Sequence, residues 1–129
     1  MKNKILIVEK NEIIRYSILH VLKREGYDTI SVSDGKSALD LLNTKKFDIL
    51  IINILLQYYS GFEIISLIRS REDLQHTKIV VISNNFTADN MYRLYQMGID
   101  DMIKKPFQPM EMICRIAKLN ELIKKEDRE

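Results

Sequence analysis

Short apolar runs alternate with amphipathic segments five times along this chain of 129 residues, and this alternation most constrains its fold. The apolar runs lie at residues 5–8, 49–52, 79–82 and 102–103, and residues 29–32 alternate between polar and apolar as expected for a half-exposed edge strand. Between them, apolar residues recur at helical spacing, first at Ile14, Ile18, Val21 and Leu22. Strands that alternate with helices form a parallel sheet covered on both faces. The sequence therefore predicts a doubly wound α/β domain.

Local signals predict where several helices begin and end. Asn11 and Asp34 precede the first two helical segments, where their side chains can cap free backbone N–H groups. Gly26 is expected to stop the first helix, and Pro109 suits the first turn of the last one. We expect the third helix over residues 63–71 and the fourth from about residue 88 to 98.

Composition excludes several classes of function. The 20 basic and 18 acidic residues are well mixed and give a net charge of +2, so we expect no direct nucleic-acid contact by this domain. A single cysteine, Cys114, rules out an internal disulfide and fits the reducing cytoplasm. No apolar stretch approaches the ~20 residues that span a membrane, so we expect a cytoplasmic protein with no membrane contact.

The last six residues are all charged, in contrast to the rest of the chain. We assign residues 1–123 to one domain and residues 124–129 to a charged tail. Two interpretations of this tail stay open, namely a solvated helix end and the start of a linker to a second domain.

Polar residues follow four of the predicted strands. They are Glu9 and Lys10, Asn53, Ser83 and Lys105. The carboxyl ends of parallel strands meet at one surface, where such folds place their ligands. Each residue alone is unremarkable at a strand end, but together they predict a site. Asn53 cannot serve there as a nucleophile toward phosphorus, because its amide carries no charge and its nitrogen lone pair is delocalised.

The chain resembles the receiver domain of two-component response regulators over its whole length. The resemblance rests on residues 4–8, 47–52, 61–63, 98–101 and 105–107, together with Ser83. It implies a flavodoxin-like receiver fold, with a five-stranded parallel sheet in the order 2-1-3-4-5 flanked by five helices. It also implies a cis peptide bond between Lys105 and Pro106.

The same resemblance implies what the site has lost. In the family, an acidic pair after the first strand holds Mg²⁺, and an aspartate at the end of the third strand accepts phosphate from a histidine kinase. Ser83 and Lys105 match the residues that hold the phosphoryl oxygens, but Glu9-Lys10 replaces the acidic pair and Asn53 replaces the acceptor. We therefore predict a degenerate pocket without a cofactor, in which Mg²⁺ binding is weak or absent.

Further departures surround this pocket. Lys10 either supplies the positive charge of the missing metal, paired with Glu9 or with the Asn53 carbonyl, or simply extends into solvent. Asn84 stands in place of a small residue and is expected to narrow access to the pocket. Met102 occupies the position of the switch aromatic residue, whose rotamer couples pocket and output surface in the family.

A charged surface is expected on the fourth helix, fifth strand and fifth helix. It carries Arg93, Asp100, Asp101, Glu111 and Arg115. These residues resemble the dimer surface of the subclass whose receivers precede a winged-helix DNA-binding domain. The resemblance implies a homodimer in which Arg93 pairs with Glu111, and Asp101 with Arg115, of a second copy.

These observations favour an atypical receiver that acts as a phosphorylation-independent regulatory and dimerisation module. It would belong to a transcriptional regulator with a DNA-binding domain beyond residue 129. The alternative is a stand-alone adaptor that binds a protein partner through the same surface. A phosphoacceptor or an enzyme is disfavoured, because no Ser-His or Cys-His arrangement and no Gly-rich phosphate loop are present. His20 and His76 are expected at the surface.

Overall fold

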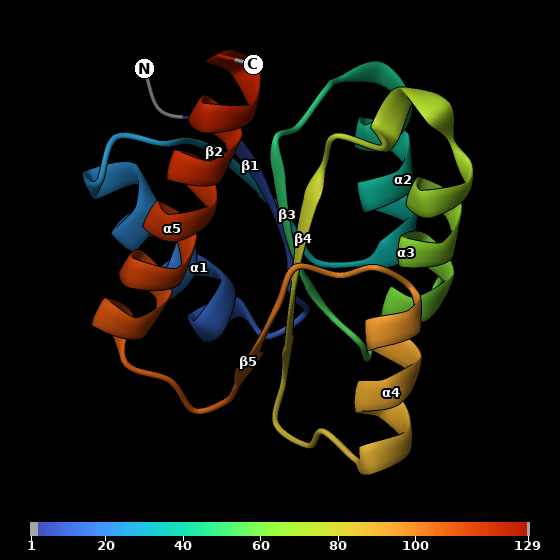
Figure 1. Ribbon diagram of the computed structural model, residues 1–129. Helices are drawn as coiled ribbons and strands as arrows, with labels where there is room; N and C mark the ends of the chain where they lie inside the picture. The colour runs from blue at the N-terminus through green and yellow to red at the C-terminus, as the bar shows by residue number, and fades with distance from the viewer. Residues whose placement is uncertain (1–2, 129) are drawn as a thin grey trace.

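The computed structural model describes residues 3–128, which form a five-stranded parallel sheet between two layers of helices (Figure 1). In chain order the elements are β1 (Lys4–Val8), α1 (Glu12–Arg24), β2 (Asp28–Val32), α2 (Gly35–Thr44), β3 (Ile49–Asn53), α3 (Gly61–Ser70), the short 3₁₀ helix η1 (Glu72–Leu74), β4 (Lys78–Ser83), α4 (Ala88–Gln96), β5 (Asp101–Lys104) and α5 (Pro109–Arg128). The strand order is β2-β1-β3-β4-β5, which confirms the predicted fold.

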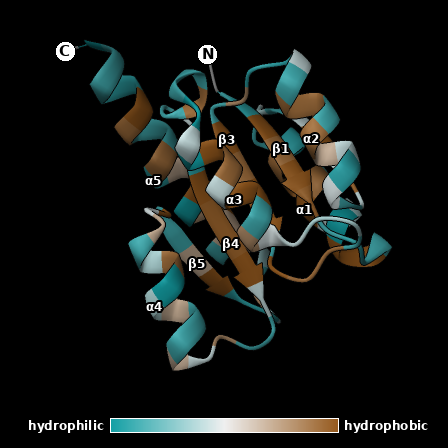
Figure 2. Ribbon diagram, turned by 90° about the vertical axis from the view of Figure 1, so that its right-hand side faces the viewer, coloured by the Kyte–Doolittle hydropathy of each residue, from teal (hydrophilic) through white to brown (hydrophobic). Residues whose placement is uncertain are grey.

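The three central strands are buried on both faces, which explains their unbroken apolar sequences. Along β1, Ile5 and Ile7 pack toward α1 and α5, whereas Leu6 and Val8 pack toward α2, α3 and α4. All four side chains are fully buried. Figure 2 shows the same division, with apolar strands inside and helices whose outer surfaces are hydrophilic.

Helix caps fix where the chain enters the helices. The side chains of Asn11 and Asp34 accept hydrogen bonds from the backbone N–H groups of Ile14 and Ser37, at 3.0 and 2.8 Å, as predicted. Gly26 follows α1 with a φ of 95°, a left-handed conformation that glycine adopts without strain. Asn11 and Asp34 therefore fix the residues at which α1 and α2 begin, and Gly26 lies where the chain leaves α1.

The third helix begins two residues earlier than predicted. Ser60 caps it by accepting from the Glu63 backbone at 3.2 Å, and the Glu63 carboxylate accepts from the Ser60 backbone at 3.3 Å. Gly61, which lies outside the predicted bounds of this helix, is thus its first residue. A Cβ atom there would lie 2.6 Å from the carbonyl oxygen of Asn53, so only glycine permits this approach to the end of β3.

The charged tail continues α5 as far as Arg128, and Glu126 forms a 2.9 Å ion pair with Lys78 of β4. Glu129 lies outside the described residues, and the domain boundary at residue 123 stays a prediction. Among the described helices, none combines the length and hydrophobicity needed to cross a bilayer.

Candidate functional site

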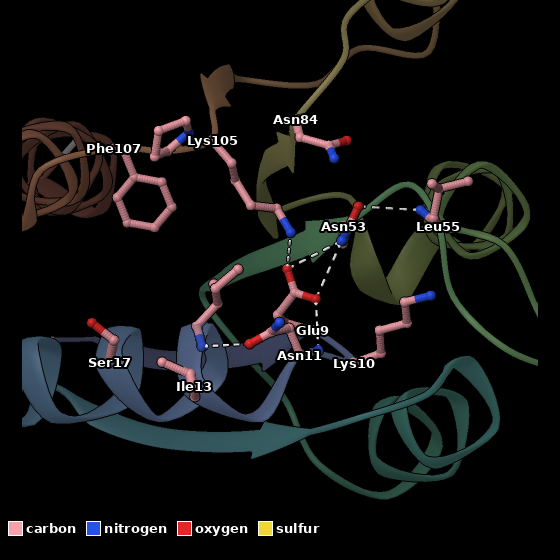
Figure 3. A pocket seen from close by; sticks show the side chains of 12 residues that line it. Glu9, Lys10, Asn11, Ile13, Ser17, Asn53, Leu55, Asn84, Lys105 and Phe107 are labelled. Carbon is pink, nitrogen blue, oxygen red and sulfur yellow. Dashed lines mark hydrogen bonds and ion pairs between the residues drawn. The ribbon is translucent and has the colours of Figure 1, made fainter.

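The carboxyl ends of β1, β3 and β5 bring Glu9, Asn53 and Lys105 into direct contact (Figure 3). Glu9 follows β1, Asn53 is the last residue of β3, and Lys105 follows β5. Parallel strands point these residues at the same edge of the sheet, so positions far apart in sequence become neighbours. The structure thus assembles three of the five predicted pocket residues.

The Glu9 carboxylate is fully buried and is bound on all sides by hydrogen-bond donors. Lys105 forms an ion pair with its Oε1 atom. The Asn53 amide nitrogen lies 3.1 Å from Oε1 and 3.2 Å from Oε2, and the backbone N–H of Asn11 donates to Oε2 at 3.0 Å. A buried carboxylate is stable only with such partners. We call Glu9, Asn53 and Lys105 the closed network.

Asn53 uses both ends of its amide within this network. Its nitrogen donates to Glu9, and its oxygen accepts from the backbone N–H of Leu55 at 3.2 Å. A carboxylate at position 53 would have no proton to donate and would bring a second negative charge next to Glu9. The amide is therefore matched to Glu9 in a way that an aspartate is not.

The donor set of the pocket does not fit Mg²⁺. This ion requires several oxygen ligands, preferably carboxylates, in a strict octahedral arrangement. Glu9 is the one carboxylate lining the pocket, and both of its oxygens already contact nitrogen donors. Within residues 3–128, no three His, Cys, Asp or Glu side chains are grouped as a metal site would require.

Lys10 does not pair with Glu9 or with the Asn53 carbonyl, as one of the two interpretations of the sequence supposed. Its side chain is exposed, and its ammonium points away from the Glu9 carboxylate, toward the side of the site where Leu55 lies (Figure 3). Successive residues of an extended chain point in opposite directions, so burying Glu9 turns Lys10 outward. Lys105 supplies the positive charge instead.

Ser83 also differs from expectation, because its hydroxyl serves the turn after β4. It accepts from the backbone N–H of Asn85 at 3.2 Å and lies 3.3 Å from the carbonyl oxygen of the same residue. Ser83 lies at the strand end, as predicted, and is buried there, but it forms its hydrogen bonds with the turn rather than with the closed network.

An open cavity of about 530 Å³ lies over the closed network. Its apolar lining comes from Ile13 and Ile14 of α1, Leu55, Pro106 and Phe107. Lys10, Asn11, Ser17 and Asn84 complete the lining beside the network. Asn84 lines this cavity, and its predicted effect on access stays a prediction. Met102 lies elsewhere, half-buried against the core on the α2–α4 side.

The apolar lining was missed by the sequence analysis. Ile13 lies outside the core stripe of α1 and is 82% exposed, and Leu55 is 64% exposed. An apolar residue next to the stripe of an amphipathic helix was the one available signal for Ile13. Leu55 offered none, since its loop has no regular period.

The residues of the predicted output surface form contacts within the chain. Arg115 of α5 donates to both carboxylate oxygens of Asp101 at 2.8 and 3.0 Å, and this hydrogen bonding raises the pKa of Arg115. The guanidinium of Arg93 lies over the ring of Phe62 of α3, 4.0 Å from its centre. Glu111 is half-buried in the first turn of α5.

Asp100 belongs to a structural clamp rather than to a free charged surface. Its carboxylate accepts from the backbone N–H of Ile79 at 2.8 Å and from Arg69 at 3.4 Å. Arg69 also donates to the carbonyl oxygens of Gly98 and Thr77, at 3.0 Å each. Burial lowers the pKa of Arg69, and the nearby Asp100 carboxylate opposes this effect. The clamp joins α3 to β4 and to the loop before β5.

A doubly wound sheet in this strand order, with Lys105 and a cis Lys105–Pro106 bond directly after β5, has the architecture of a receiver-like domain. The family model of the response regulator receiver domain matches residues 5–117. The chain therefore belongs to the response regulator receiver family.

Relatives of known function support this assignment. The chain is 32% identical over 116 residues to the alkaline phosphatase synthesis transcriptional regulatory protein PhoP of Bacillus subtilis, covering 90% of this chain and 48% of that protein. It is 28% identical to the phosphate regulon transcriptional regulatory protein PhoB of Escherichia coli, covering 90% of this chain and 51% of that protein. The chain thus spans about half the length of these curated relatives.

Solved structures agree on the fold. The signal receiver domain of a putative Luxo repressor protein from Vibrio parahaemolyticus superimposes with a TM-score of 0.90, at 23% identity, over 98% of this chain and 96% of that one. The chemotaxis response regulator CheY4 of Vibrio cholerae gives a TM-score of 0.86, also at 23% identity, over 92% and 99%. At this identity the likeness shows the fold alone.

Proposed function

We propose that this receiver is a regulatory module that works without phosphorylation and has no catalytic activity of its own. The observation that carries the proposal is the closed network. Glu9 is already neutralised by Lys105, and Asn53 fills the place where a phosphoacceptor would need a carboxylate. Neither the acceptor group nor the donor set for a metal is available, so the phosphoryl-transfer step has no starting point.

We further propose that the module dimerises through α4, β5 and α5 in a cytoplasmic transcription regulator. The transcriptional role is supported by relatives that are transcriptional regulatory proteins about twice as long as this chain. The dimer is supported by exposed apolar side chains on this surface. Tyr92 and Tyr95 of α4 are 62% and 74% exposed, and Leu122 of α5 is 43% exposed. Tyrosines are enriched at protein interfaces.

The proposal is tested by adding Mg²⁺ with acetyl phosphate or beryllofluoride and following the amide spectrum by nuclear magnetic resonance. We expect the spectrum of the unchanged protein to stay the same. The double variant Lys10→Asp/Asn53→Asp is the positive control, because it restores carboxylates at both altered positions while Ser83 and Lys105 stay. Saturable shifts around Asn53 in the unchanged protein would overturn the proposal.

The link to a DNA-binding domain has a separate test. The chain studied has a mass of 15.2 kDa. The intact mass of the protein isolated from its own cells should be about twice that value if an output domain is attached. A mass equal to that of the chain would contradict the transcriptional role and favour an adaptor.

A further inference from the structure

The cavity over the closed network has properties of a small-molecule site that the proposed function does not use. Its volume of about 530 Å³ lies within the range of roughly 300–1,000 Å³ found for ligand pockets. It is formed by α1 and by the loops that follow β1, β3, β4 and β5. A molecule bound there would contact four of the five loops at this edge of the sheet.

One side of the cavity is apolar and exposed. Ile13 and Ile14 of α1 and Phe107 after β5 line it, and Ile13 keeps 82% of its surface accessible. In Figure 3, Ile13 and Phe107 lie on the same side of the Glu9–Asn53 contact. Several large apolar groups around one hollow mark a place where an apolar group can be buried.

The other side carries an uncompensated positive charge. Among the charged residues of the cavity, Lys105 is neutralised by Glu9, which leaves Lys10 and a net charge of +1. Lys10 is exposed, and no ion pair is formed by it within the described part of the chain. Asn84, also exposed, lies on this side with Leu55, and an amide can donate to an anion (Figure 3).

We infer that this cavity binds a small organic acid with an apolar body. Its carboxylate contacts Lys10 and Asn84, and its apolar body packs against Ile13 and Phe107. The inference rests on the proposed function, because the organic acid can be the signal only if phosphorylation is not. The organic acid is then the signal that takes the place of phosphate. It acts by contacting at once the loops that lead into α1, α4 and α5.

The test uses phenylbutyrate as the probe and phenylbutyramide as its neutral counterpart. Titrations followed in the amide spectrum should give saturable shifts at the cavity residues with phenylbutyrate. Binding of phenylbutyramide should be about threefold weaker, the size expected from one exposed ion pair. Equal binding of the two probes would mean that the apolar side of the cavity accepts any apolar group, such as a side chain of a partner protein. That result would overturn the inference that the ligand is an organic acid.

Two variants locate the contacts. Lys10→Met should remove the preference for the carboxylate and leave binding of the amide unchanged, whereas Lys118→Met, an exposed lysine on α5, should change neither. Ile13→Ser should weaken both probes. A carboxylate preference that survives Lys10→Met, or shifts outside the cavity, would disprove the inference.

The same samples separate this inference from the proposed function. Saturable shifts with Mg²⁺ and acetyl phosphate in the unchanged protein would overturn the proposed function, and this inference with it. A spectrum unaffected by both phosphate analogue and phenylbutyrate would overturn this inference alone.

Discussion

The side-chain amide of Asn53 donates to both carboxylate oxygens of Glu9, at 3.1 and 3.2 Å, in a position that is almost fully buried. This contact requires a donor at position 53 and an acceptor at position 9. With Lys105 on the same carboxylate, the network balances its charge without an ion from solution. The amide at position 53 and the paired carboxylate at position 9 are therefore parts of one arrangement.

Restoring aspartate at position 53 should destabilise the protein. In Asn53→Asp the new carboxylate faces Glu9 without a proton to donate. The ammonium group of Lys105 is then the one positive charge in the network for two carboxylates. We expect a loss of about 2 kcal/mol in the free energy of unfolding at neutral pH, measured by urea denaturation. Asn84→Asp makes the same change at an exposed position and should cost little.

The loss of unfolding free energy in Asn53→Asp should depend on pH. The neighbouring charge raises the pKa of the new carboxyl in the folded state above its unfolded value, so the unfolded chain gives up its proton first. The deficit is then greatest near neutral pH and shrinks as the pH falls toward the ordinary carboxyl pKa of about 4. If the difference in free energy of unfolding between the variant and the unchanged protein stayed constant from about pH 7 to about pH 4, a packing defect would be the cause instead.

Lys105 is predicted to be structural here. Lys105→Met leaves the fully buried Glu9 carboxylate without its cation, and breaking a buried ion pair from one side costs about 3 kcal/mol. Calorimetric or urea unfolding measures this loss. Adding Glu9→Gln should recover part of it, since the unpaired charge is then gone.

The matched control for this variant is Lys104→Met, the preceding lysine, whose side chain is exposed. It should leave stability nearly unchanged. If the two single variants were equally stable, the ion pair between Lys105 and Glu9 would contribute nothing and the closed network would lose its basis.

The sequence was sufficient to place the strand ends but not to say which side chains meet there. Apolar runs bounded by polar residues predicted Glu9, Asn53, Ser83 and Lys105 at one edge, because a parallel sheet leaves no other arrangement. The partner of Glu9 depends on side-chain direction. Lys10 is adjacent in sequence yet points away, whereas Lys105 reaches Glu9 from the end of β5.

The predicted output surface shows a similar limit. Charge and spacing identified Asp100 and Arg93, but these patterns do not distinguish a solvent-facing charge from one used inside the fold. Asp100 accepts a backbone hydrogen bond from Ile79, and Arg93 rests on Phe62. Both contacts join residues far apart in sequence, which no local period reveals.

The clamp made by Arg69 and Asp100 yields a prediction about stability. Arg69→Met removes the donors to the carbonyl oxygens of Gly98 and Thr77 and leaves Asp100 without its cation. We expect a loss of about 1–2 kcal/mol in the free energy of unfolding. Arg24→Met, at an exposed arginine near the end of α1, is the control and should have no measurable effect. Equal stability of both variants would show that the clamp is not needed.

The proposed dimer predicts how charge reversal affects self-association. Arg115→Glu places a second acid beside Asp101 and removes the cation offered to another copy, so the dissociation constant from sedimentation equilibrium should rise at least fivefold, by roughly 1 kcal/mol. Adding Asp101→Arg restores opposite charges both within and between copies and should recover much of the affinity. Equal sedimentation of all three proteins would argue against this surface.

Apolar contact should matter more than charge at the same surface, because exposed ion pairs contribute little to affinity. Tyr95 is 74% exposed on α4 and lines a hollow with Asp101 and Met102. Tyr95→Ser should raise the dissociation constant of the dimer about tenfold or more, as burying an aromatic anchor accounts for a large share of binding energy. Tyr58→Ser is the matched control, since Tyr58 is 76% exposed and belongs to the loop after β3 rather than to α4, β5 or α5. If both tyrosine variants associate as tightly as the unchanged protein, the dimer does not use this surface.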